Sequence, residues 1–244
     1  MMYSSYGTHY SGTGFDWIYL VILLILFAAS LGASSLVNNR YKKYSMVKAI
    51  SGISGAEAAR QILAAQGVTS TDIVMKQGKD LSDYYDPKTD TIHLSANTYN
   101  SCSIAAIGVA CHEAGHAIQY AKGYGPVRLR MSIIPFSNIC SRLAIPLIFI
   151  GFILSGLASG MSFVALIGII LYAVAVFVQL LTLPVEFDAS RRALANIRSC
   201  GIVTQEESQG AKSVLTAAAM TYVVAMLTSV VQLLRFISIF NRRR

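Results

Sequence analysis

The sequence predicts an α-helical integral membrane protein with three to four transmembrane helices and a small cytoplasmic α+β domain. Of its 244 residues, 54% are hydrophobic and only 13% are charged, whereas about a quarter of the residues in a soluble domain are charged. Several uncharged apolar runs are long enough to cross the hydrocarbon core of a bilayer. The net charge of +8 comes from lysines and arginines beside these runs, which indicates membrane topology and argues against binding to nucleic acid.

The N-terminal region is expected to contain a flexible tail, residues 1–16, followed by a transmembrane helix, residues 17–37. No basic residue precedes this apolar run and no small-residue cleavage site follows it, so it is predicted to be a retained span and not a signal peptide. Basic residues follow it at Arg40, Lys42 and Lys43. Under the positive-inside rule they place the tail outside the cell and the next segment in the cytoplasm.

Residues 38–142 change in character and are predicted to form the cytoplasmic domain. In the stretch Ser54–Gly67, a serine precedes Glu57 by three positions and a glycine ends a helical pattern, which is typical of a capped helix. In Asp80–Ser95, turn residues stand between stretches with alternating apolar positions, so this part is predicted to be a hairpin or an edge strand. The cysteines lack CxxC spacing and are expected to be reduced thiols: Cys102, Cys111, Cys140 and Cys200.

Residues 143–185 form the longest uncharged apolar stretch and are predicted to be a transmembrane helical hairpin. The stretch exceeds one span and just suffices for two, with a natural turn at Ser155–Ser162. A tight hairpin enters and leaves the membrane on one side, so its two flanks share a compartment. Both flanks are basic, which again places them in the cytoplasm: Arg128, Arg130, Arg142, Arg191, Arg192 and Arg198.

The last apolar run, residues 213–236, is predicted to be a fourth transmembrane helix. Such a span would leave the basic C-terminal tail, residues 237–244, outside, against the charge bias. The alternative is a helix that packs on the cytoplasmic domain at the membrane surface, because Thr221, Thr228 and Gln232 fall near one helical face. Residues 186–212, between the hairpin and this run, are expected to form a cytoplasmic segment.

The motif HEAGH at residues 112–116 is the clearest chemical signal in the chain. His112 and His116 are four residues apart, so on a helix both imidazoles lie on one face and can bind a single ion. Glu113 lies beside them, where its carboxylate can act as a general base toward a water molecule that zinc has acidified. HExxH also occurs by chance on solvated helices, but this chain has only four histidines and five glutamates. The pattern therefore favours a zinc peptidase site.

A catalytic zinc site needs a third protein ligand, and Glu186 is the strongest candidate. It follows directly on the apolar run of residues 143–185, where a carboxylate is costly unless it is paired or binds a metal. The alternative role for Glu186 is an ion pair with Arg191 or Arg192. Asp188 is a competing ligand, although pairing with Arg192 or orienting a zinc-bound histidine is favoured for it. Other groups are expected elsewhere: His9 in the tail, His93 in the hairpin, Glu57 at a helix cap, and Glu206 and Glu207 in a polar loop.

Several sequence blocks recur together in one known family. LSDYYDP, IHLS, HEAGHAIQ, RLR, TLPVEFDASRRAL and GAKSVLTAAAMTYVVAMLTSVVQLLR occur in this order. With the apolar segments between them, they resemble the YugP-type zinc-dependent membrane peptidases of bacteria over residues 41–235. The resemblance implies a zinc ion held by His112, His116 and, by analogy with gluzincins, Glu186, with Glu113 as the general base.

Two positions depart from the patterns of related enzymes. The family often has DHYDP where this chain has DYYDP, so Tyr84 stands in place of a histidine. Gluzincins outside this family commonly place an aspartate four residues after the ligand glutamate, and that position here is Ser190. The departure at Ser190 bears on which groups orient the ligands. It bears less on the identity of the ligands.

Two other classes of protein compete with a gluzincin peptidase. An intramembrane protease of the site-2 type would carry HExxH in a spanning helix and take its third ligand from an aspartate in a later span. A soluble-looking domain precedes the motif, and Asp188 lies just past an apolar run, not inside it. A catalytically silent membrane scaffold is the third possibility, and nothing structural would require His112, Glu113, His116 and Glu186 together.

The favoured interpretation is a zinc endopeptidase in the bacterial plasma membrane that hydrolyses peptide bonds near its cytoplasmic face. The expected partners are the lipid bilayer and membrane-protein or peptide substrates, with no nucleic acid. An extended substrate is expected to add to an edge strand near Thr91–Ser95. The sequence leaves the oxyanion-stabilising residue open among His93, Tyr99, Tyr120 and Arg128. Asp188, His93, Arg128 and Arg192 are expected to contact substrate or to orient the ligands.

Overall fold

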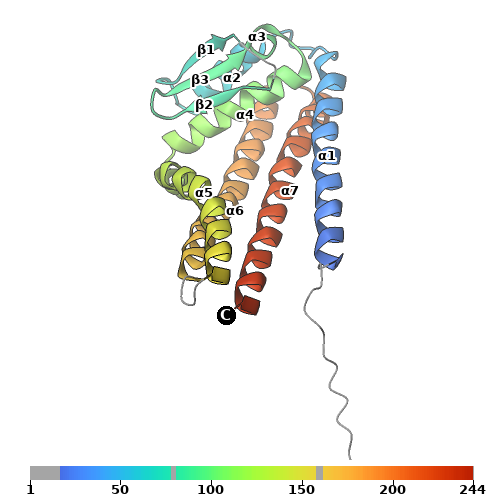
Figure 1. Ribbon diagram of the computed structural model, residues 1–244. Coiled ribbons are helices and arrows are strands. Elements are labelled where there is room, and N and C mark those ends of the chain that lie inside the picture. The colour runs from blue at the N-terminus through green and yellow to red at the C-terminus, as the bar shows by residue number, and fades with distance from the viewer. Residues whose placement is uncertain (1–16, 78–80, 158–161, 244) are drawn as a thin grey trace, which may run out of the picture.

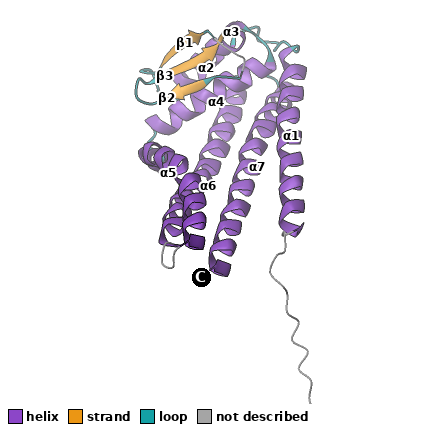
Figure 2. Ribbon diagram, viewed as in Figure 1, coloured by secondary structure: helices purple, strands orange, loops and turns teal. Residues whose placement is uncertain are grey.

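The computed structural model describes residues 17–77, 81–157 and 162–243. The expected flexible tail, residues 1–16, lies outside the described residues, as do positions 158–161 of the expected hairpin turn. The described chain is mostly helical and contains one small sheet (Figure 1, Figure 2). All four cysteines are free, as predicted.

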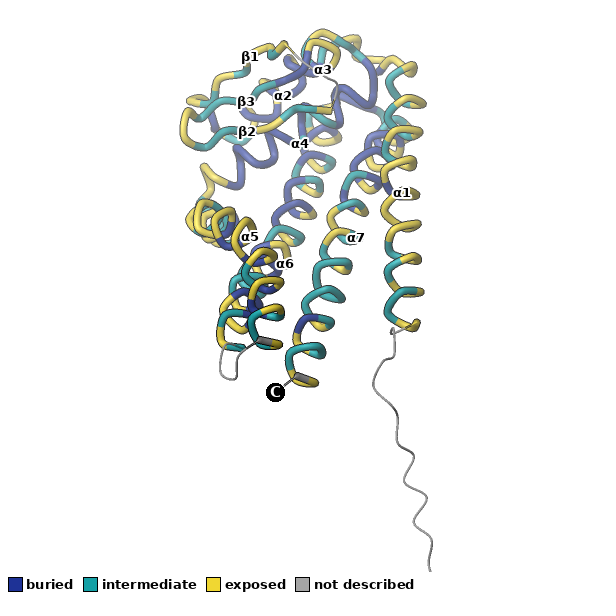
Figure 3. The backbone as a smooth tube through the Cα atoms, in the orientation of Figure 1, coloured by how far each residue is buried: buried dark blue, intermediate teal, exposed yellow. Residues whose placement is uncertain are grey.

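Within the described residues, four helices are long and apolar enough to cross a membrane. They are α1 (Trp17–Ser45), α5 (Gly125–Leu157), α6 (Ser162–Ser199) and α7 (Gln205–Arg243). They extend from one side of a smaller domain, residues 55–121, which contains the sheet (Figure 1). Only 6% to 33% of each apolar stretch is buried within the protein, and exposed positions run along the helices in Figure 3. Apolar surface of this extent needs an apolar solvent, which a bilayer supplies.

The boundaries of the long helices differ from the expected segment boundaries. Helix α1 continues to Ser45, and α5 begins at Gly125, so α5 runs without a break past the expected boundary at residue 142. Helix α7 contains all of residues 213–236 and contacts α1 and α6. The expected polar loop at Glu206 and Glu207 is wrong, because both lie in the first turn of α7. Thr204 and Glu207 exchange hydrogen bonds there and cap the helix.

The smaller domain lies at one end of the long helices. It consists of α2 (Gly55–Ala65), β1 (Asp72–Lys76), β2 (Tyr84–Asp86), β3 (Thr91–Ser95), α3 (Ala96–Asn100) and α4 (Ile104–Ala121). Helix α2 is the predicted capped helix, since Ser54 and Glu57 form a capping box. Strands β2 and β3 form the predicted antiparallel hairpin.

The expectation that Thr91–Ser95 is an edge strand is wrong. The strand order is β1-β3-β2, so β3 is the central strand and both of its edges are already paired. The parallel partner β1 was not anticipated, because its burial does not alternate and therefore leaves no period-two signal. A substrate cannot add to β3, and the free edges of this sheet belong to β1 and β2.

Helix α4, which carries the HEAGH motif, is buried along most of its length (Figure 3). Gly115, inside the motif, lies against the backbone of α6: a Cβ atom there would come within 2.6 Å of the carbonyl oxygen of Ala189. No side chain fits at that distance, so the glycine permits the close approach of α4 and α6. This approach brings the histidines of α4 next to Glu186 on α6.

Candidate metal centre

Three donor groups converge between α4 and α6. The Nε2 atoms of His112 and His116 lie 3.2 and 3.4 Å from the Oε2 atom of Glu186, and all three donor atoms lie within 4.8 Å of one another. In a tetrahedral site with bonds of about 2.0–2.1 Å, donor atoms are roughly 3.3 Å apart. The two histidine–glutamate separations therefore fit a single zinc-sized ion with a position left for water. The carboxylate of Glu186 need not move to bind an ion together with either histidine.

A buried glutamine orients His116. The Oε1 atom of Gln119 lies 3.0 Å from Nδ1 of His116, while its Nε2 atom donates to the carbonyl of Val185 and to Asp188. Because the amide nitrogen already serves two acceptors, Oε1 must be the acceptor toward His116. Nδ1 of His116 then carries the proton, which leaves the lone pair of Nε2 for a metal.

A serine occupies the corresponding position beside His112. The hydroxyl of Ser190 lies 3.1 Å from Nδ1 of His112, one helical turn after Glu186 on the same helix. Ser190 therefore stands at the position where gluzincins commonly carry an aspartate, and its neutral hydroxyl reaches the histidine ring. This contact resolves the departure noted in the sequence, because the position keeps its partner although the residue type differs.

The alternative role for Glu186, an ion pair with Arg191 or Arg192, does not occur in the structure. Both arginines instead bind Asp188, whose carboxylate also accepts the hydrogen bond from Gln119. Asp188 is thus outside the ligand cluster and holds the glutamine that orients His116. The arginine that pairs with Glu186 is Arg130 of α5, at 3.3 Å.

The electrostatics of α4 suit proton transfer. Burial raises the pKa of the Glu113 carboxyl, and the nearby imidazoles only partly oppose this effect. Burial lowers the pKa of His116, but the hydrogen bond and charge of Glu186 outweigh it and leave that pKa above its ordinary value before a metal binds. A metal ion at His116 would therefore compete with a proton for the ring.

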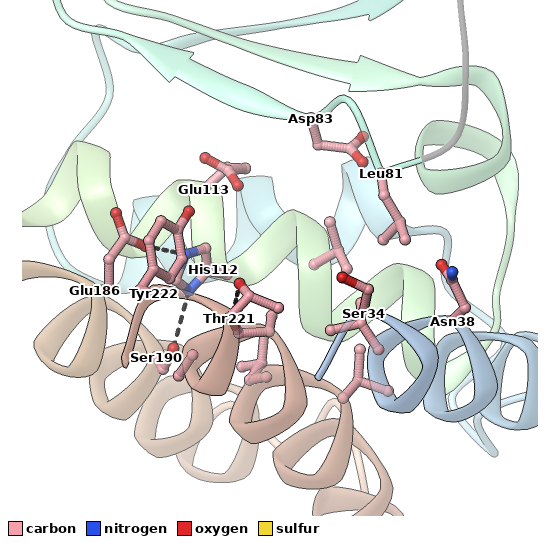
Figure 4. Close-up of a pocket in the computed structure, with 16 residues that line it drawn as sticks. Ser34, Asn38, Leu81, Asp83, His112, Glu113, Glu186, Ser190, Thr221 and Tyr222 are labelled. Carbon is pink, nitrogen blue, oxygen red and sulfur yellow. Dashed lines mark hydrogen bonds and ion pairs between the residues drawn. The ribbon is translucent and has the colours of Figure 1, made fainter. Parts of the chain in front are cut away.

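A cavity of about 340 Å³ opens beside the ligand cluster (Figure 4). Glu113 faces it, and its carboxylate has no hydrogen-bond partner among the described residues. Helix α7 supplies Thr221 and Tyr222 to the lining, and α1 supplies Ser34 and Asn38. The cavity is therefore bounded by the small domain on one side and by the long apolar helices on the other.

The sequence-based candidates for contact with substrate lie outside this cavity. His93 stacks on Tyr84, Tyr99 binds Arg60, and Tyr120 lies against Tyr85. Arg128 and Arg192 do not line the cavity either. Sequence reasoning missed three residues near the donor cluster, Gln119, Arg130 and Tyr222, and noted Ser190 only as a departure from a pattern. Among the three, Gln119 carried a local signal, because it stands three residues after His116 and so shares its helical face.

Comparison with known proteins agrees with this geometry. Residues 19–241 match a family model described as "Putative neutral zinc metallopeptidase". The chain is also 43% identical over 227 residues to the "Putative membrane protease YugP" of Bacillus subtilis (strain 168), an alignment that covers 93% of this chain and 98% of that protein. No solved structure matches the chain. The matched range includes the three donor residues and Glu113.

Proposed function

We propose that this chain, which belongs to the neutral zinc metallopeptidase family, is a membrane-embedded endopeptidase that cleaves peptide bonds near the cytoplasmic membrane face. The observation that carries the proposal is a cluster of three donors within 4.8 Å of one another, two of them buried and one partly buried, beside a buried glutamate without a hydrogen-bond partner among the described residues that faces a cavity. A silent scaffold would not need this combination. The intramembrane alternative is less well supported, because α4 belongs to the small domain and the third donor is a glutamate at the end of an apolar run.

His112, His116 and Glu186 are the residues that would hold zinc. Two neutral imidazoles and one carboxylate are a donor set typical of catalytic zinc. When bound, zinc would acidify a water molecule and polarise the scissile carbonyl. Gln119 and Ser190 fix the two rings, so the donors need not reorganise when the metal enters.

Glu113 would move the proton. Its buried carboxylate would accept a proton from the attacking water and then deliver it to the nitrogen of the leaving amine. The upward shift of its pKa helps the second transfer, since a carboxylate of higher pKa holds the proton until the amine leaves. The carboxylate can turn into the cavity because no hydrogen bond within the described residues restrains it.

Tyr222 is the residue best placed to stabilise the oxyanion. It extends from α7 to the same cavity as His112, Glu113 and Glu186 (Figure 4). Its hydroxyl has no hydrogen-bond partner among the described residues and can donate to the carbonyl oxygen as negative charge develops there. We propose this role in place of the four candidates that the sequence suggested.

The position of the cavity indicates membrane-associated substrates. Its lining includes Val37, where the apolar run of α1 ends, and Val214, where the apolar run of α7 begins. A scissile bond must therefore approach close to the bilayer surface, which suits segments that flank a transmembrane helix. The basic residues after the first apolar run, Arg40 to Lys43, support a cytoplasmic location for this end of the molecule.

Removal of zinc should abolish hydrolysis reversibly. Protein purified in detergent should contain one equivalent of zinc by elemental analysis and should cleave a quenched-fluorescent peptide library. A chelator should remove both the metal and the activity, and added zinc should restore both. Wild-type protein that stays free of zinc after reconstitution would rule out the peptidase and favour the scaffold.

Replacing Tyr222 with phenylalanine should lower kcat by about 100-fold, which is the usual effect of losing one oxyanion donor. Zinc content and KM should change little, because the hydroxyl forms no hydrogen bond with the donor residues or with any other described residue. The matched control is Tyr120→Phe, which removes the hydroxyl of a tyrosine outside the cavity. Equal kcat values for the two variants would exclude the proposed role of Tyr222.

A further inference from the structure

A second groove, of about 340 Å³, runs between α6 and α7 on the other side of Ser190. Ser190, Leu215 and Ala219 line both this groove and the metal cavity, so they form the wall between the two. A molecule in the groove would therefore not enter the metal site. Of the residues that line the groove, the proposed peptidase mechanism uses only Ser190, whose hydroxyl lies beside His112.

The groove has a basic end and an apolar end. Arg191, Arg198 and Lys212 contribute cationic side chains, and all three residues are exposed. The apolar part includes Phe187, whose side chain is half exposed, and Leu215. Between Phe187 and Arg198, α6 rises by about 16 Å, so the two ends lie at clearly different depths along the helix axis.

The change from apolar to basic lining coincides with the ends of the apolar runs. On α6 the uncharged run ends at Val185, and on α7 it begins at Ser213. Phe187 thus lies two residues past the run of α6, and Leu215 lies in the first turn of the run of α7. Arg198 and Lys212 lie outside these runs. The groove straddles the boundary between hydrocarbon and headgroups for any bilayer that the two helices cross.

Two of the three cations of the groove, Arg198 and Lys212, have no carboxylate partner within the described part of the chain. No aspartate or glutamate lines it. The adjacent Asp188 already binds Arg191 and Arg192, and neither Arg198 nor Lys212 forms an ion pair with any described residue. Ser208, Gln209 and Thr216 add hydrogen-bonding groups to the lining.

We propose that this groove binds the phosphate headgroup of an anionic phospholipid, with an acyl chain along Phe187 and Leu215. A phosphate accepts charge-assisted hydrogen bonds from arginine and lysine, and basic pockets between membrane helices on the cytoplasmic side suit anionic headgroups. A free phosphate ion shares the headgroup chemistry but makes no use of the apolar end. The proposal concerns binding alone and does not depend on peptidase activity.

The test is lipid retention by the full-length protein, measured by native mass spectrometry after equilibration with mixed vesicles of phosphatidylglycerol and phosphatidylcholine. Wild-type protein should retain phosphatidylglycerol about tenfold over phosphatidylcholine. The double variant Arg198→Gln/Lys212→Gln should lose this preference. The control is Arg142→Gln, which removes an exposed cation of α5 outside the groove and should retain the wild-type preference.

Three outcomes would overturn the proposal. Equal retention of the two lipids by wild-type protein would show that the groove does not select an anionic headgroup. An equal loss of preference in the double variant and in Arg142→Gln would assign the selectivity to general surface charge. Displacement of phosphatidylglycerol by inorganic phosphate alone, tested in a parallel sample, would identify a free-anion site. Equal melting temperatures and zinc contents of the variants would confirm that their folds are intact.

Discussion

Replacing Glu113 with glutamine should lower kcat/KM by about 10³-fold, within the range that a positioned general base contributes, and should leave one zinc ion bound. The amide has nearly the size of the carboxylate but cannot accept a proton from water. Glu113 is absent from the donor cluster, which is formed by His112, His116 and Glu186. The change therefore removes the proposed proton carrier and keeps the proposed ligands.

Hydrolysis of the peptide library and elemental analysis on the same preparation would measure the two effects. The control is Glu57→Gln, which changes an exposed glutamate that caps α2 and should keep full activity. Wild-type activity in Glu113→Gln would contradict its role as general base. Loss of zinc from this variant would instead make Glu113 part of the metal site.

The local features of the fold could be predicted from the sequence. The capping box of α2 lies within four residues, the HEAGH helix shows its pattern within five, and each apolar run is continuous. Strand β1 escaped prediction because its parallel pairing with β3 joins residues 19 apart, as in Asp72 with Thr91, and leaves no pattern in either strand. Because β1 pairs with β3, the strand that was expected at the edge of the sheet is its central strand.

The residues of the candidate site also fall into two groups, those that the sequence indicates and those that only the fold brings to the site. His112, Glu113 and His116 are fixed by spacing on one helix, and Glu186 was indicated by the scarcity of carboxylates and its place after an apolar run. Arg130 and Tyr222 reach the site only through the packing of α5 and α7, which spacing along the chain does not reveal. Ser190 was noticed only as a departure, because a neutral hydroxyl is a common side chain without a fixed role.

The ligand cluster joins two parts of the molecule that contact each other through small residues. The histidines belong to the small domain, Glu186 belongs to a candidate membrane span, and the contact of Gly115 with Ala189 sets the distance between the two helices. A metal held by both helices would therefore stabilise the docking of the domain on the spans. By linkage, a zinc concentration of 100 times Kd would add about 2.7 kcal/mol to the free energy of unfolding.

Replacing Glu186 with glutamine should weaken zinc binding by more than about 100-fold, because loss of a direct ligand should exceed the 10- to 100-fold effect of an outer partner. The neutral amide is a poor zinc ligand and also leaves Arg130 without its carboxylate. Zinc should then raise the melting temperature of wild-type protein but not that of the variant. Competition with a chelator of known affinity would give the dissociation constants.

A graded series of variants on α6 separates ligation from general damage to that helix. Ser190→Ala removes only the hydroxyl beside His112 and should weaken zinc binding by about tenfold. Ser199→Ala removes a hydroxyl that bonds to the backbone of its own helix and should leave zinc binding unchanged. If Glu186→Gln bound zinc as tightly as wild type, the carboxylate would serve only as the partner of Arg130 and the third ligand would lie elsewhere. We expect zinc affinity to fall in Glu186→Gln and Ser190→Ala but not in Ser199→Ala, and to fall further in Glu186→Gln. This order is expected if Glu186 contacts the metal directly and Ser190 acts through the histidine.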